Sequence, residues 1–168
     1  MCISNNTYHR APISSTSALV NFGPKAMSAS APPDRPPTLF ETYTYKNIGT
    51  IELKVDVHLP STPYAGACPV ILYIPGGGWI GCSRTDYSSA LFHSFLSLCS
   101  IVCCINYRLL PETHISGLID DVKSIESWIK EVLPMKMRDI GVEVDHSKIV
   151  VVGGSAGGHL ALLTVCNP

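Results

Sequence analysis

The sequence predicts an α/β fold built on a mostly parallel β-sheet with an antiparallel N-terminal edge. The first observation is a segment of alternating apolar and polar residues at 50–59, preceded by a second extended segment. The second is a set of three short, continuous apolar runs at residues 69–74, 100–106 and 148–153. Such runs are typical of strands buried on both faces of a parallel sheet. The third is the helical spacing of apolar residues between these runs.

Size and composition narrow the class of protein. The chain has 168 residues, 46% of them apolar, which is enough for a sizeable core and excludes a wholly disordered protein. Only 15% of residues are charged and the net charge is −1, so the basic surface of a nucleic-acid-coating protein is absent. We therefore expect a small-molecule partner. Large α/β enzyme folds commonly need about 200 residues or more, so the chain is short for one complete sheet.

Cysteine usage and hydropathy indicate the compartment. The seven cysteines form no C-x-x-C pair and no histidine lies at ligand spacing, which predicts free thiols, no metal site and a reducing environment. We expect no cofactor. No apolar stretch reaches the roughly 18 residues of a membrane span, so the prediction is a cytoplasmic protein. The first 33 residues contain Arg10, Lys25 and no acid, which leaves an organelle transit peptide as an alternative.

The chain divides at about residue 38. Residues 1–38 are rich in Ser, Asn, Ala and Pro and are predicted to be a disordered leader, and residues 39–168 are predicted to form the folded domain. Residues 50–59 alternate five apolar with four polar positions, which predicts a strand with one buried and one solvent-exposed face, ended by Pro60. Residues 40–46 are its expected antiparallel partner.

Helices are expected after each apolar run. Residues 85–98 place apolar side chains on roughly one helical face. Residues 118–133 form a second apolar stripe, with Asp120 and Asp121 expected in a favourable first turn and Pro134 expected to end the helix. A third apolar helix is expected at residues 160–165.

The segment from Gly153 to Leu160 carries the clearest chemical motif. It is a G-x-S-x-G sequence placed between a predicted strand and a predicted helix, the context of a nucleophile elbow, in which a sharp turn exposes the serine hydroxyl. Gly153 and Gly157 would allow close backbone packing around Ser155. The backbone N–H of Ala156 would point at a developing oxyanion. The alternative is a turn rich in glycine and serine with no reactivity.

An earlier turn, at residues 75–79, is also rich in glycine. Gly76, Gly77 and Gly78 let peptide N–H groups approach a substrate oxygen without interference from a Cβ atom. Both turns follow predicted strands, and ligands of open α/β sheets bind beyond the carboxyl ends of strands. The alternative for this turn is a tight connection without a binding role.

The sequence resembles the α/β-hydrolase fold, and within it the hormone-sensitive-lipase-like and related short carboxylesterases, from about Val55 onward. The motifs that carry the resemblance are residues 73–79, 107–112, 120–121 and 154–161. The resemblance implies a partial α/β-hydrolase sheet with helices on both faces and a serine esterase acting on a small ester. It implies that residues 107–112 brace the site. The site residues it implies are Ser155 as nucleophile, Gly76, Gly77, Gly78 and Ala156 as oxyanion-hole donors, and Trp79 near the substrate entrance.

The sequence departs from the family pattern at two points. Pro75 stands where the family usually has histidine, which removes an imidazole and a backbone N–H. Triad partners follow the serine in the order acid, then histidine, yet the thirteen residues after Ser155 include no Asp or Glu. His159 lies one helical turn past Ser155 and is expected to be structural.

The remaining histidines do not stand where a triad base is expected. His58 is predicted on the exposed face of a strand, His93 on a helix, and His114 and His146 in loops. We therefore expect a chain truncated after the nucleophile helix, without full turnover of its own. The strand at 148–153 is then expected to be an exposed edge that favours self-association.

Two other functions stay open. One is a catalytically inactive remnant or interaction protein, which the missing triad members favour. The other is dinucleotide binding, because residues 76–81 satisfy G-x-G-x-x-G after a predicted strand. That fingerprint requires a helix that opens within the motif and an acid about 20 residues on, whereas bulky Trp79 and Ile80 occupy the turn.

Overall fold

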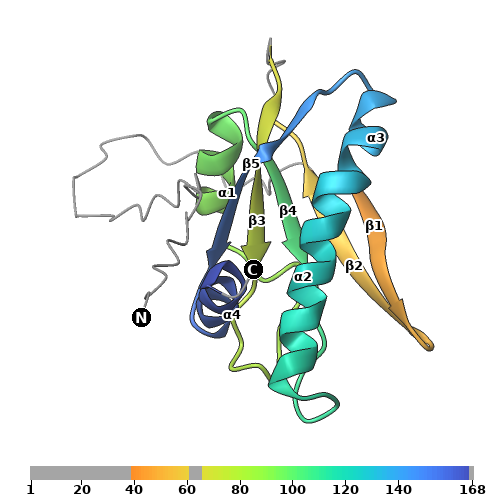
Figure 1. Ribbon diagram of the computed structural model, residues 1–168. Coiled ribbons are helices and arrows are strands. Elements are labelled where there is room, and N and C mark those ends of the chain that lie inside the picture. The colour runs from red at the N-terminus through yellow and green to blue at the C-terminus, as the bar shows by residue number, and fades with distance from the viewer. Residues whose placement is uncertain (1–38, 61–65, 167–168) are drawn as a thin grey trace, which may run out of the picture. The chain divides into compact units, whose positions relative to one another are not determined.

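The structure is a computed structural model that describes residues 39–60 and 66–166 (Figure 1). The predicted leader at residues 1–38 lies outside the described residues. The elements in chain order are β1 (Leu39–Ile48), β2 (Ile51–His58), β3 (Cys68–Ile74), α1 (Ser89–Ser97), β4 (Ile101–Ile105), α2 (Ile115–Glu131), α3 (Leu133–Arg138), β5 (Val144–Gly153) and α4 (Ala156–Cys166).

The five strands form one mixed sheet in the order β1-β2-β4-β3-β5. β1 pairs antiparallel with β2, and β2 pairs antiparallel with β4. β3 pairs parallel with β4 on one side and with β5 on the other. This confirms the predicted α/β sheet with an antiparallel N-terminal edge. Because Ile74 and Gly153 are register partners, the carboxyl ends of β3 and β5 lie side by side.

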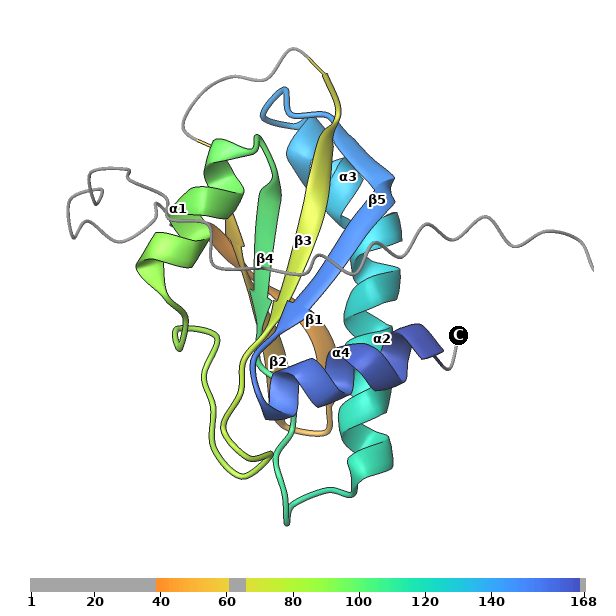
Figure 2. The ribbon, with the colours of Figure 1, turned by 90° about the vertical axis from the view of Figure 1, so that its left-hand side faces the viewer.

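Helices cover both faces of the sheet (Figure 2). α2, α3 and α4 pack on one face, where the larger core joins Leu118, Ile125 and Leu160 to the strands. α1 packs on the opposite face, where Phe92 and Leu96 form a smaller core with residues of β3 and β4. None of the helices in the described ranges is both long and apolar enough to cross a bilayer.

The prediction of a solvent-exposed face on β2 is wrong at its C-terminal end. His58 is 1% exposed and Asp56 is also buried. The rings of Tyr87 and Phe92 lie edge-on to His58, with centroid distances of 5.5 and 5.4 Å. The alternating pattern of β2 describes that strand alone. It did not predict the burial of His58, because the segment around α1 covers this residue.

The first helix is shorter than the sequence predicts. α1 begins at Ser89, not residue 85, and the hydroxyl of Ser88 accepts the backbone N–H of Leu91. Tyr87 precedes the helix but stacks on Phe92 at 3.9 Å between ring centroids. Leu98, expected on the apolar face, lies after the last turn and is exposed. A side-chain cap therefore decides where this helix starts.

Two expectations about the second helix are also wrong. α2 begins at Ile115, so Asp120 and Asp121 lie beyond its first turn. Pro134 does not end α2 but stands in the first turn of α3, where a missing N–H costs nothing. His146, expected in a loop, lies within β5, whereas His93 is on α1 and His114 precedes α2 as expected.

Candidate active site

Ser155 stands between the end of β5 and the start of α4. It is exposed, and its φ of +51° is in the left-handed region that non-glycine residues rarely adopt. The N–H of Gly157 donates to the carbonyl of Gly154 at 2.9 Å, and the N–H of His159 donates to that of Ser155 at 3.1 Å. The predicted strand, sharp turn and helix are confirmed. The turn places the exposed Ser155 directly before α4, at a helix N-terminus, where backbone N–H groups favour negative charge.

Two glycines make this turn sterically feasible. A Cβ atom at Gly157 would collide with the carbonyl oxygen of Ile74 and lie 2.7 Å from that of Pro75. A Cβ atom at Gly153 would collide with the backbone of Gly157. The expected close packing at these two glycines is confirmed, and it fixes the start of α4 directly against the end of β3.

The glycine loop, residues 75–81, lies against the same turn. A Cβ atom built on Gly76 would lie 2.8 Å from the carbonyl oxygen of Gly154 and 3.5 Å from the Cβ of Ser155. Gly77 and Gly78 have φ values of +126° and +62°. The N–H groups of Ile80 and Gly81 both donate to the carbonyl of Gly77, at 3.2 and 3.1 Å. The two predicted site segments therefore meet at one end of the sheet.

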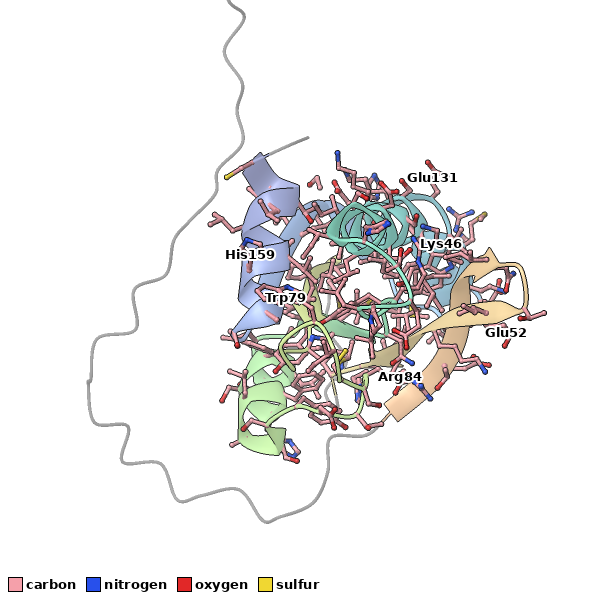
Figure 3. The ribbon with its side chains drawn as sticks, turned by 90° about the horizontal axis from the view of Figure 1, so that it is seen from below. Lys46, Glu52, Trp79, Arg84, Glu131 and His159 are labelled. Atoms are coloured by element: carbon pink, nitrogen blue, oxygen red, sulfur yellow. The ribbon has the colours of Figure 1, made fainter. Side chains whose placement is uncertain are left out.

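Trp79 connects the glycine loop to α4. Its ring meets that of His159 nearly at a right angle, with centroids 5.4 Å apart (Figure 3). Its φ is +65°, and its indole N–H is buried with no hydrogen-bond partner among the described residues. This contact places the exposed ring of His159 against Trp79.

The segment at residues 107–112 holds the glycine loop at two points. The buried hydroxyl of Tyr107 donates to the carbonyl of Pro75 at 2.9 Å. The N–H of Leu110 donates to the carbonyl of Trp79 at 2.8 Å, and the Leu110–Pro111 peptide bond is cis. Burial, together with a hydrogen bond to Cys82, raises the pKa of Tyr107, so its hydroxyl stays a donor at neutral pH. This is the bracing that the resemblance implies.

Replacing Tyr107 by phenylalanine tests this brace. The carbonyl of Pro75 would lose its donor inside the protein, and an unsatisfied buried polar group costs about 1 to 3 kcal/mol. We expect the free energy of unfolding to fall by that amount in urea titration followed by circular dichroism. Tyr43→Phe is the matched control, because its hydroxyl donates to Glu41 at the surface. Equal losses of unfolding free energy in Tyr107→Phe and Tyr43→Phe would contradict the role of Tyr107 in holding the glycine loop.

Asp121 on α2 holds the segment at residues 107–112 through Arg108. Its fully buried carboxylate accepts the Nε and Nη2 of Arg108 at 2.8 and 2.9 Å and the backbone N–H of Arg108 at 3.0 Å. Lys46 on β1 donates to the same carboxylate at 2.7 Å. Sequence reasoning placed Asp121 in a first helical turn and missed this ion-pair cluster, because Lys46 is 75 positions away.

A second buried carboxylate, that of Asp56, holds Arg84, which follows the glycine loop in the chain. Asp56 accepts the Nε of Arg84 at 2.7 Å and the hydroxyl of Thr42 at 2.6 Å. The backbone N–H of Arg84 donates to the side chain of Asn106 at 2.9 Å. The sequence contains no local pattern that predicts this contact between Asp56 and Arg84.

The described residues do not support the dinucleotide alternative. After Gly81 the chain runs without a helix until α1 begins at Ser89, whereas the fingerprint needs a helix that opens within the motif.

In the ranges 39–60 and 66–166 no group of three His, Cys, Asp or Glu side chains could hold a metal ion. The cysteines in these ranges are free, and burial raises the pKa of Cys103 to about 12.

Comparison with known proteins points to one family. The BD-FAE family model matches residues 55–167. Two solved structures of esterase 2 from Thermogutta terrifontis, one with bound propionate and one phosphorylated by paraoxon, superpose with TM-scores of 0.60 and 27% identity. The matches cover 72% of this chain and 43% and 45% of the respective esterase chains.

Sequence relatives come from much longer proteins. The non-reducing polyketide synthase atr1 of Stereocaulon alpinum is 38% identical over 126 residues, which cover 74% of this chain and 5% of the synthase. The non-reducing polyketide synthase ascC of Acremonium egyptiacum is 35% identical over 125 residues, covering 74% and 6%. The chain therefore spans a small part of these synthases and less than half of the esterase.

Proposed function

Because the chain belongs to the BD-FAE family, an α/β-hydrolase-type family of esterases, we propose that it carries the nucleophile of a serine carboxylic-ester hydrolase. One observation carries the proposal. Ser155 is exposed with a φ of +51° between β5 and α4, and the glycine loop packs against it. Backbone strain of this kind persists only where the surrounding structure enforces it, and it clusters at functional sites.

The proposed reaction is acyl transfer through Ser155. The hydroxyl oxygen attacks the ester carbonyl carbon while a general base takes the hydroxyl proton. The resulting oxyanion accepts hydrogen bonds from N–H groups of Gly76, Gly77, Gly78 and Ala156. The carbon–oxygen bond to the alcohol then breaks, the alcohol leaves with the proton, and water hydrolyses the acyl-serine. Trp79 is proposed to line the substrate entrance.

The general base and its carboxylate partner are assigned to polypeptide outside these 168 residues. No Asp or Glu follows Ser155 in the sequence, and the His159 ring lies against Trp79. Removing triad members lowers turnover by several orders of magnitude, although the oxyanion hole still supports residual catalysis. We therefore expect a slow but specific reaction at Ser155 in this chain.

Covalent labelling with a fluorophosphonate probe tests this role. We expect slow labelling of the full chain that is absent in Ser155→Ala and unchanged in Ser97→Ala, which removes another exposed serine. Added imidazole should accelerate labelling of the unmodified chain but not of Ser155→Ala, because it can act as the external base. Labelling that persists in Ser155→Ala would overturn the assignment. No labelling with or without imidazole would favour an inactive remnant or interaction protein.

The sequence relatives support a second candidate, acyl transfer from a polyketide substrate. Identity to the two synthases is 38% and 35%, against 27% to the esterase structures. The same serine chemistry would then accept an acyl group from a thioester, with a thiol as the leaving group. Incubation with an aromatic N-acetylcysteamine thioester and, separately, with p-nitrophenyl acetate distinguishes the two candidate functions. A Ser155 acyl adduct that forms faster from the thioester than from the acetate ester favours the polyketide substrate.

A further inference from the structure

We propose that strand β1 positions the glycine loop for catalysis at Ser155. β1 precedes residues 55–167, which the family model matches. Three of its side chains contact residues that hold the segments next to the glycine loop, and these positioning residues are Thr42, Tyr45 and Lys46. The inference rests on the proposed function, because the position of the loop matters for catalysis only if its N–H groups stabilise the oxyanion.

A β-bulge at Tyr45 directs two neighbouring side chains of β1 to the same face of the sheet. Thr44 and Lys46 pair with consecutive residues of β2, so Tyr45 is the extra residue between them. In a regular strand, adjacent side chains point to opposite faces. Here Tyr45 belongs to the larger core, on the face that α2 covers, and Lys46 reaches Asp121 on α2. Bulges re-aim side chains in this way and are common next to active sites.

Tyr45 holds the residue that directly follows β4. Its hydroxyl donates to the backbone carbonyl of Asn106 at 2.6 Å, and the side-chain oxygen of Asn106 accepts the backbone N–H of Arg84 at 2.9 Å. Asn106 also precedes Tyr107, whose hydroxyl donates to the carbonyl of Pro75. Burial raises the pKa of Tyr45, so its hydroxyl stays a donor at neutral pH. One buried hydroxyl therefore holds a residue that connects to both sides of the glycine loop.

Lys46 contributes to the buried ion-pair cluster at Asp121. Its Nζ lies 2.7 Å from Oδ1 of Asp121, and Nη2 of Arg108 lies 2.9 Å from the same oxygen. The other oxygen, Oδ2, accepts the backbone N–H of Arg108 at 3.0 Å. Charge-assisted hydrogen bonds of this kind are short and restrict the geometry of the groups they join. Lys46 therefore helps to fix the carboxylate that holds Arg108, the neighbour of Tyr107.

Thr42 acts on the opposite face of the sheet. It is the register partner of Asp56, which follows the core residue Val55 and so points to the other face. The hydroxyl of Thr42 donates to Oδ1 of Asp56 at 2.6 Å, and the same oxygen accepts Nε of Arg84 at 2.7 Å. Asp56 is buried, so both donors compensate a charge that water reaches poorly. β1 therefore contacts the supports of the glycine loop from both faces of the sheet.

Fluorophosphonate labelling of Ser155 in variants of β1 tests the proposal. Tyr45→Phe removes only a hydroxyl, and Lys46→Met removes only an ammonium group. With imidazole present, we expect each variant to label about threefold more slowly or worse, because displaced oxyanion donors lose much of their effect. Lys46→Arg keeps a charged donor at this position and should restore most of the labelling rate. If Tyr45→Phe or Lys46→Met fails to fold, Thr42→Val replaces it in the test.

Two substitutions nearby in the chain are the matched controls. Tyr43→Phe removes a hydroxyl that donates to Glu41 at the surface, and Lys54→Met removes a surface ion pair with Glu52. Neither should change the labelling rate. Circular dichroism establishes that each variant is folded under the labelling conditions. A merely structural role would lower the free energy of unfolding but leave the labelling rate of the folded chain unchanged, and that result would overturn the proposal.

Amide NMR signals of Gly76, Gly77 and Gly78 separate this proposal from the proposed function. If the unmodified chain does not label, the proposed function fails, yet these signals still report where the loop lies. Tyr45→Phe and Lys46→Met should shift them, and the two controls should not. Glycine signals that stay unchanged in both variants would overturn the proposal, whether or not Ser155 labels.

Discussion

Gly157→Ala is expected to lower the free energy of unfolding by about 3 kcal/mol or more, the upper end of the overpacking range. The added Cβ would collide with the carbonyl oxygen of Ile74 and lie 2.7 Å from that of Pro75. Both are backbone atoms at the end of β3, so no flexible side chain can move aside. Relief would require α4 to separate from β3, which also separates Ser155 from the glycine loop. Urea titration followed by circular dichroism measures the loss.

Gly154→Ala is the control for this prediction. Gly154 lies in the same turn, but a Cβ there would meet no atom within 4 Å. We expect a change of about 0.5 kcal/mol or less, as for substitutions that create no contact. If Gly157→Ala were as stable as Gly154→Ala, α4 could not be packed on β3 as described.

Asp121→Ala is expected to cost about 3 to 5 kcal/mol, the range for breaking a buried ion pair from one side. The substitution removes the acceptor of the Arg108 guanidinium, the Arg108 backbone N–H and the Lys46 ammonium. Because the side chains of Arg108 and Lys46 are 19% and 22% exposed, water can partly solvate them, which favours the lower end of the range. The loss is measured by the same urea titration.

Asp120→Ala supplies the matched comparison on the same helix. Its side chain is exposed on α2, and we expect a change within about 0.5 kcal/mol. Asp121→Ala should also slow fluorophosphonate labelling of Ser155. Asp121 holds Arg108, and the neighbouring Tyr107 donates to the carbonyl of Pro75, where the glycine loop beside Ser155 begins. Similar stability of the two variants would contradict a structural ion-pair cluster at Asp121.

The sequence predicted the strand, turn and helix around Ser155 better than the contacts that support this turn. The G-x-S-x-G motif placed Ser155 between a strand and a helix because the residue types that permit the turn lie within five positions. The continuous apolar runs likewise identified β3, β4 and β5 as strands of one parallel region. These features are local, so periodicity and turn chemistry report them directly.

The supports depend on contacts between distant segments. The alternating pattern predicts Asp56 and His58 on a solvent-exposed face. In the structure Thr42 and Arg84 contact Asp56, and the ring of Phe92 packs against His58. Lys46 and Asp121 are 75 positions apart, so no local pattern joins them. The start positions of α1 and α2 were also missed. The hydroxyl of Ser88 caps α1, whereas His114 precedes α2 without a side-chain cap hydrogen bond, so no capping residue marks that start in the sequence.

Peptide-resolved mass spectrometry after exposure to paraoxon tests most directly the claim that Ser155 is a nucleophile. A structure of Thermogutta terrifontis esterase 2 phosphorylated by this compound is similar to the chain. We predict a single diethylphosphoryl group on the peptide that contains Ser155, absent in Ser155→Ala. An unmodified chain after prolonged exposure in the presence of imidazole, or an adduct on another residue that persists in Ser155→Ala, would contradict the account.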